Sequence, residues 1–439
     1  GALTARHIEA LGRTVDFSGP VEAMLTREAF ALDGDLRASG QTSALFADGR
    51  LQTSLAYDRV RRRFELQQAE LTSTALTLDA SGWVNGGDGE FSGAWRARKL
   101  EAFAPTMAGA ANGSWRAFRE GAGRARVWAT AIATEDARVT STSALISQLL
   151  GRSPRFDTRL RYENNGVSVT YARLDGAQLR AGATGRIVRG VGDLILEASV
   201  RGPLAIGGAS LEGAADMTGV ITGPITRPAL TARAQLANLH ASGVVVEQPV
   251  LTLELAPEHG VYRGRATLDG HASGQTIAGA ANIAAESNSV SLTQLDAQWG
   301  ALQAQGSAQF ANGAMSAALD VNGAIDGLFA GASGRIAGRL ALTPDRINLT
   351  ADMADARFGE LRARTATLRA DGPLDAINTQ FDMRGHLRRA PLTFAGVAVF
   401  DVDGSARIEG RGALAGAPIY TRAPIEARWA RGRSLISLN

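Results

Sequence analysis

Five histidines are the side chains of this chain best suited to acid-base or metal chemistry, and they stand far apart: His7, His240, His259, His271 and His386. None has a second ligand-type residue at the spacing that a helix or hairpin uses to bind a metal. Cysteine is absent, and neither a nucleophile elbow, nor a phosphate-binding loop, nor a zinc-protease motif occurs. The sequence therefore predicts no catalytic residue, no metal and no cofactor, and a protein that is not an enzyme.

A cluster of arginines is the other chemically suggestive feature. It comprises Arg59, Arg61, Arg62 and Arg63 in YDRVRRRF, and it could bind phosphate, either of nucleic acid or of anionic lipid headgroups. We favour a simpler explanation, a hairpin end with solvated arginines. The formal charge of the chain is only +3 and its six tryptophans are scattered, so no basic stripe with stacking aromatics predicts nucleic-acid binding.

Most of the chain consists of short segments in which apolar and polar residues alternate, separated by glycine, Asn-Gly, Asp-Gly or proline. VLTLELA (250–256), DLILEASV (193–200) and INLTADM (347–353) are examples. This pattern is typical of antiparallel all-β proteins. Helical spacing is found only in SALISQLLG (143–151), which ends on a glycine, and as a second short helix in the first dozen residues.

The alternating segments recur as modules. Three 21-residue windows align without gaps from Phe64, Val167 and Val290, each with leucine at its thirteenth position. About 36 residues after each start comes a second, glycine-rich similar piece. We therefore expect an array with residues 1–60 as its start or a preceding module, three β modules at 61–163, 164–286 and 287–390, and a partial module at 391–439.

One apolar face runs along the predicted strands. Alternate residues point to the same side of a sheet, which gives these candidates for lining a groove: Val167, Val169, Tyr171, Leu194, Leu196, Leu251, Leu253, Leu255, Ile347 and Leu349. A closed sandwich or barrel core would also use such a face. Because many further positions of the face hold alanine or glycine, we favour a long sheet that curls without closing and leaves an apolar trough.

The stretch GVITGPITRPALTARAQLANL (219–239) is the last of three segments that together resemble a known family. A strand pair comes first, a glycine-rich segment second, and this stretch third. This order of segments resembles that of the AsmA-like (TamB) family over most of residues 60–390. The related YdbH and YhdP proteins have a similar amino-acid composition. The membrane helix and partner-binding domain of the family are not recognisable here. Within the stretch, Pro224 and Pro228 are expected at strand starts, where a missing N–H is tolerated.

The resemblance implies an all-β fold, an elongated, curled antiparallel β-sheet (a β-taco or β-groove) of repeated modules with an apolar interior and few short helices. It implies a periplasmic protein, anchored in the inner membrane by a segment outside this chain, that moves phospholipids to the outer membrane by their acyl chains. An outer-membrane barrel partner such as TamA would be bound through other parts. Lack of cysteine fits an oxidising compartment, and the missing initiating Met suggests a piece of a longer polypeptide.

Two other functions remain open at this point. One is an assembly factor of the translocation and assembly module, which helps outer-membrane β-barrel proteins or autotransporters to insert and offers strand edges to them. The other is a structural or adhesive β-repeat stalk with a solid interior. Regular rungs of about 20 to 25 residues would favour the stalk, whereas the modules here are near 100 residues long.

Overall fold

The chain is described from a computed structural model, which covers residues 1–10, 13–39, 46, 48–121, 126–163, 165–206, 209–241, 244–286, 289–311, 314–328, 331–401, 405–430 and 433–437. It divides into two compact units, unit 1 (Gly1–Pro228) and unit 2 (Ala229–Asn439). The division falls inside the expected module 164–286, and the expected module boundaries stay a prediction.

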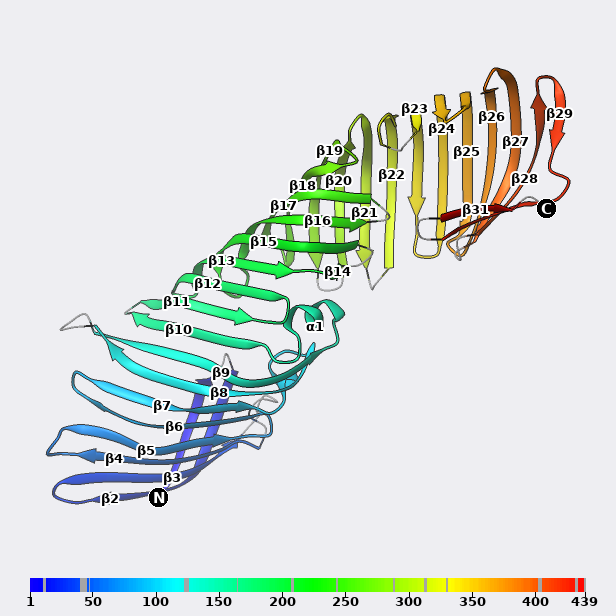
Figure 1. Cartoon of the computed structure of the whole chain (residues 1–439). Helices are drawn as coiled ribbons and strands as arrows, with labels where there is room; N and C mark the ends of the chain where they lie inside the picture. The colour runs from blue at the N-terminus through cyan, green and yellow to red at the C-terminus, as the bar shows by residue number, and fades with distance from the viewer. Residues whose placement is uncertain are drawn as a thin grey trace. The chain divides into compact units, whose positions relative to one another are not determined.

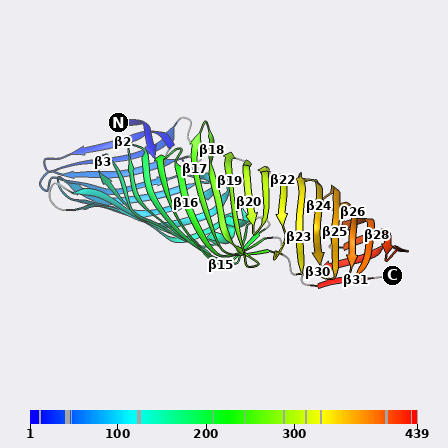
Figure 2. The same cartoon turned by 90° about the horizontal axis from the view of Figure 1, so that it is seen from above.

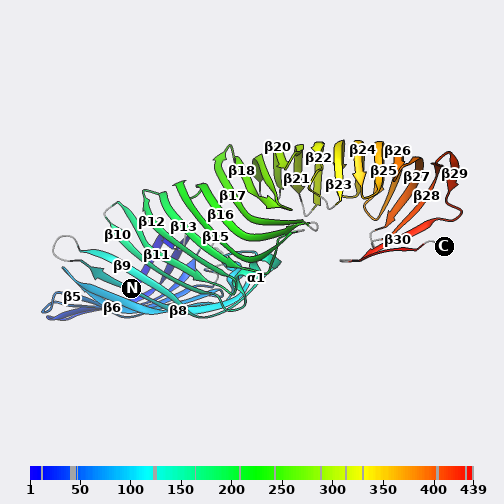
Figure 3. The ribbon, with the colours of Figure 1, turned by 45° about the horizontal axis from the view of Figure 1, so that its top comes forward.

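Unit 1 is an antiparallel sheet whose strands follow the order of the chain, as Figures 1 and 3 show for β8 to β15. Its strands are β1 (Ala2–Ala10), β2 (Arg13–Leu25), β3 (Ala29–Ser39), β4 (Arg50–Asp58), β5 (Arg63–Thr72), β6 (Leu76–Asn85), β7 (Gly89–Ala97), β8 (Met107–Glu120), β9 (Val127–Ser141), β10 (Arg155–Glu163), β11 (Gly166–Asp175), β12 (Leu179–Val188), β13 (Val191–Arg201), β14 (Leu204–Ile206) and β15 (Ala209–Pro224). A 3₁₀ helix (Leu100–Ala102) and the α-helix α1 (Ala144–Leu150) lie between strands.

Unit 2 continues the same pattern, and Figure 2 shows β16 to β28 side by side in chain order. Its strands are β16 (Ala229–Ala241), β17 (Val244–Glu258), β18 (Val261–Ala272), β19 (Gln275–Glu286), β20 (Ser289–Trp299), β21 (Leu302–Ala311), β22 (Ala314–Ala324), β23 (Ala332–Leu342), β24 (Arg346–Phe358), β25 (Leu361–Pro373), β26 (Ala376–Leu387), β27 (Ala390–Asp401), β28 (Ser405–Leu414), β29 (Ala417–Tyr420), β30 (Ile425–Ala430) and β31 (Arg433–Ser437).

The strands belong to one sheet, which closes on itself in neither unit within the described residues. In unit 1 each strand pairs with its neighbours in sequence from β1 to β13, and β13 pairs with β15, but no pairing joins β1 to β15. In unit 2 the ladder runs from β16 to β28, and then through β30 to β31. The expected class, an all-β protein built on an open antiparallel sheet with little helix, is confirmed.

Three local expectations can be compared with the structure. The helix expected at 143–151 is α1: Oγ of Ser143 accepts the N–H of Ile146 at its start, and Gly151 ends it with φ of 67°. The helix expected in the first dozen residues is wrong, because Ala2–Ala10 pairs with β2 as a strand. Pro224 ends β15 rather than starting a strand, whereas Pro228 directly precedes β16 as expected.

One cluster of buried side chains lies near the start of unit 1, and the other buried apolar residues are spread along both units. Phe17, Leu36 and Phe46 are at most 5% exposed and pack with three further side chains, Val15, Ala75 and Leu76. Phe46 lies in the connection between β3 and β4, and Ala102 of the 3₁₀ helix packs against the same cluster. Irregular connections therefore cover the apolar side of the sheet at this cluster.

Candidate functional site

A row of apolar residues crosses unit 1 from strand to strand. In antiparallel ladders directly paired residues share a face, and the pairings connect thirteen residues in one line: Ala23, Leu32, Leu55, Leu66, Gly82, Phe91, Ala117, Thr130, Leu160, Val169, Gly185, Leu194 and Ile221. Thr130 is its one polar member. At about 4.8 Å between strands the row measures roughly 60 Å.

Unit 2 carries a row of the same length and character. Its thirteen paired residues are Ala234, Leu251, Leu268, Gly279, Ala297, Ala304, Val321, Gly338, Ala351, Leu368, Phe381, Gly396 and Gly410. A neighbouring row on the same face runs from Leu230 through Leu255 to Ile347. We call these surfaces the apolar face of each unit.

Nine of the ten groove candidates lie on the apolar face. Val169 and Leu194 belong to the row of unit 1, and Val167 and Leu196 lie two residues from them on the same strands. In unit 2, Leu251, Leu253 and Leu255 alternate along β17 without interruption. Ile347 and Leu349 do the same on β24, where Leu349 pairs with Leu340.

Tyr171 lies on the opposite face, contrary to the expectation. Val169 pairs with Gly185 and Ala172 with Ala183, so two residues of β11 face the single residue Thr184 of β12. The extra residue is Thr170, since Leu160 pairs with Val169 and the next residue back, Arg159, pairs with Tyr171. Such a β-bulge reverses the alternation beyond it.

The apolar face is only partly covered. The chain exposes 27094 Å² of surface, whereas a compact protein of 45.8 kDa exposes about 16,000 Å². Leu251 is 37% exposed in the middle of its row, and Leu253 and Leu349 are partly buried. Within the described residues these side chains are not sealed in a closed core, so they can accept an apolar ligand.

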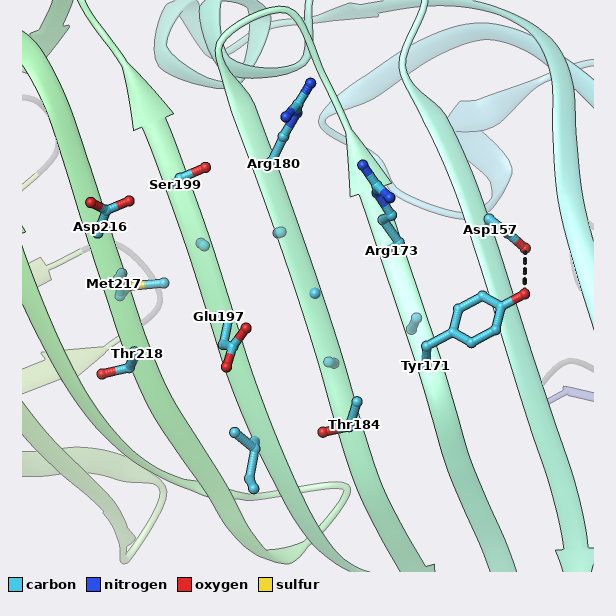
Figure 4. Close-up of a pocket in the computed structure, with 16 residues that line it drawn as sticks. Asp157, Tyr171, Arg173, Arg180, Thr184, Glu197, Ser199, Asp216, Met217 and Thr218 are labelled. Atoms are coloured by element: carbon cyan, nitrogen blue, oxygen red, sulfur yellow. Dashed lines mark hydrogen bonds between the residues drawn. The ribbon is translucent and has the colours of Figure 1, made fainter.

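The opposite face is polar and contains a hollow of about 800 Å³ over β10 to β15. Figure 4 shows Asp157 on β10, Arg173 on β11 and Glu197 on β13, and the Tyr171 hydroxyl lies 3.5 Å from an Asp157 carboxylate oxygen. Arg180 and Asp216 also line the hollow. Charges of both signs line it, so the hollow selects no single class of ligand.

Ion pairs across neighbouring strands connect the polar face in both units. Arg50 donates to both carboxylate oxygens of Asp35, at 2.7 and 2.6 Å, and the hydrogen bond with the guanidinium lowers the pKa of Asp35. Arg346 and Asp371 repeat this geometry on β24 and β25, where the hydrogen bond from Arg346 lowers the pKa of Asp371. These charges are exposed and act between strands, not in a catalytic cleft.

The histidines are spread over the sheet. His240 lies in β16, His271 in β18, His386 in β26 and His259 in the turn after β17, while the side chain of His7 is outside the described part. Among the described residues, no three side chains of the metal-ligating types come together. The helices described are too short or too polar to cross a bilayer.

Sequence reasoning missed the small residues that complete the rows. Gly82 and Gly185 of unit 1 and Gly338 of unit 2 sit directly between larger apolar neighbours, and a residue without a side chain gives no hydrophobic signal. Their positions two or four residues from leucine or isoleucine of the same strand would have identified them. A scan of the sequence against protein-family models finds no matching family, and a search of curated proteins finds no matching relative.

Proposed function

We propose that this chain is a segment of a periplasmic, bridge-like lipid-transfer protein of the AsmA-like family. Its apolar face would hold the acyl chains of phospholipids that pass between the inner and outer membranes. The observation that supports this proposal is the apolar row across each unit, thirteen strands wide, interrupted only by Thr130 in unit 1, and only partly covered. Conduction along a surface requires such continuity, and it requires no reactive residue.

The energetics of an acyl chain on this face suit transfer. Each CH₂ removed from water contributes about 0.8 kcal/mol, so a chain of about sixteen carbons is held firmly even when it is half covered. A chain lying along a row meets apolar surface on nearly every strand, so moving by one strand changes its energy little. Many positions of the rows are alanine or glycine, such as Ala297 and Ala304. These small residues do not protrude from the sheet, so they do not obstruct an acyl chain that slides along it.

Three neighbouring residues of β13 provide a sharp test. Leu194 and Leu196 lie on the apolar face, and Ile195 between them lies on the polar face with 53% exposure. A photo-crosslinking amino acid at Leu196 should form adducts with phospholipid in cells, and the same group at Ile195 should not. Equal labelling at both positions, or labelling at neither, would overturn the proposal.

Unit 2 offers the same comparison on β24. Leu349 lies on the apolar face, and Thr350 beside it lies on the polar face and is exposed. Native mass spectrometry of the purified chain should find co-purifying phospholipid, and Leu349→Asp should reduce it while Thr350→Asp should not. If the protein is purified without detergent and neither the unchanged protein nor the variants carry lipid, the proposal is contradicted. Adducts with unfolded barrel proteins instead of lipid would favour the assembly-factor function.

A further inference from the structure

One rim of unit 1 is formed by the turns that join even-numbered to odd-numbered strands from β2 to β13, together with the turn that follows β15. We call it the arginine rim and define it as residues 24–28, 59–62, 86–88, 126, 165, 189–191 and 225–227. Backbone hydrogen bonds connect successive turns: the N–H of Arg59 donates to the Glu28 carbonyl at 2.9 Å, and that of Ile225 donates to the Gly190 carbonyl at 2.9 Å. Figure 1 shows these turns together on the left side of unit 1.

The described residues of the arginine rim are strongly basic. They contain Arg27, Arg59, Arg61, Arg62, Arg126, Arg189 and Arg227, against two acidic residues, Glu28 and Asp88. Arg126 lies 3.9 Å from Asp88 and Arg61 lies 3.7 Å from Asp58, at the end of β4. In the part of the chain that the structure describes, Arg59 and Arg62 have no ion pair. The rim therefore carries net positive charge on a chain whose total is only +3.

The same turns expose large aliphatic side chains. Val60 is 78% exposed between Arg59 and Arg61, and Leu25 and Met24, at the end of β2, are 68% and 64% exposed. Val191 and Ile225, at the other end of the rim, are 52% and 54% exposed. Val60 and Leu25 are the two most exposed large apolar side chains among the described residues. A rim that met only water would not place them beside its arginines.

We propose that the arginine rim binds the surface of an anionic phospholipid bilayer. The arginines bind headgroup phosphates, and the aliphatic side chains at the turn tips enter the boundary between headgroups and acyl chains. Nucleic acid fits less well, because the exposed tips are aliphatic and cannot stack on bases. This inference goes beyond the proposed function, since it concerns the rim of unit 1 and not the apolar face.

Sedimentation with vesicles tests the inference. The chain should bind vesicles of phosphatidylcholine with phosphatidylglycerol much more strongly than vesicles of phosphatidylcholine alone, and added salt should weaken the binding. The triple variant R59Q/R61Q/R62Q should lower the partition constant at least tenfold, since each arginine near an anionic surface contributes about fivefold, or ~1 kcal/mol. Val60→Ser should also weaken binding.

A matched control is the triple variant R362Q/R364Q/R369Q, which removes three exposed arginines of β25 and should leave vesicle binding unchanged. L194D/L196D, on the apolar face, should likewise still bind vesicles, so a failure of the proposed function and a failure of this inference give different results. Circular dichroism confirms that each variant is folded. Equal binding to neutral and anionic vesicles, or stronger binding to a short DNA duplex at physiological salt, overturns the inference.

Discussion

Val169 and Tyr171 are two residues apart in β11 and yet lie on opposite faces of the sheet. Val169 is 9% exposed in the apolar row, whereas Tyr171 is 37% exposed beside Asp157. Thr170, the extra residue of the bulge, separates them. The bulge leaves Ala172, and hence the rest of β11, in register with the apolar face.

Deleting Thr170 should therefore be tolerated. The shortened strand alternates regularly, with Val169 and Ala172 on the apolar face and Tyr171 between them on the polar face. Deleting Ser168 instead places Val169 on the polar face, and the loss of its burial should cost about 2 kcal/mol more. Urea unfolding of the two deletion variants measures this difference. Equal loss of stability would show that the bulge itself is required.

The glycines of the unit 2 row should differ sharply in their tolerance to alanine. A Cβ on Gly410 would lie 2.5 Å from the ring of Phe394, whereas on Gly279 it would meet nothing closer than 3.9 Å. We expect Gly410→Ala to destabilise the chain by about 1 to 3 kcal/mol through overpacking. Gly279→Ala should be neutral or stabilise it by up to about 1 kcal/mol. Differential scanning calorimetry provides the comparison, and the reverse order would contradict the described packing.

The Asp371 carboxylate should give the stability of unit 2 a weak acid dependence. Its pKa is lowered from 3.8 by the hydrogen bond from Arg346, so the folded chain binds the proton less readily than the unfolded chain does. The stabilisation is therefore present above about pH 4 and disappears as the pH falls through the lowered pKa. Asp371→Asn should lower the melting temperature slightly at pH 7, and this effect should become smaller as the pH falls below about 4. An effect of equal size at pH 7 and at pH 2 to 3 would exclude this pair as its source.

Removing lipid should lower the melting temperature of the chain. A ligand that binds only the folded state stabilises it by about 2.7 kcal/mol at a concentration of 100 Kd. Adding a short-chain phospholipid to the delipidated chain should restore the higher melting temperature. Leu253→Asp, on the apolar face, should abolish the restored increase, and Glu254→Gln, on the exposed polar face of the same strand, should leave it intact. A full increase in Leu253→Asp would place the lipid elsewhere.

Alternation alone predicted the faces correctly wherever strands pair without a bulge. Residues 250–258 of β17 pair in regular register with residues 261–269, and Leu251, Leu253 and Leu255 share a face as expected. The helix at 143–151 was also predictable, because an N-cap serine, helical spacing and a terminal glycine coincide there. Both patterns act over a few neighbouring residues, where sequence information is strongest.

Effects that depend on the neighbouring strand were not predictable. The bulge at Thr170 shows only in the pairing with Leu160 and Gly185, and the sequence near it still reads as regular alternation. The strand at Ala2–Ala10 forms by pairing with β2, which overrides a local helical spacing. The sequence showed the arginines of the 59–62 turn, but only the pairing order reveals that Arg189 and Arg227 lie on the same rim.

The pairing of each strand with its sequence neighbours has a consequence for how the chain folds and varies. Folding can begin at any hairpin and spread outward, because most strands pair with the strand next to them in the chain. Adding or removing one hairpin changes only the two ladders beside it. The molecule can therefore become longer or shorter by one hairpin at a time, which is about the width of two strands. Residues away from the changed hairpin keep the neighbours that they had.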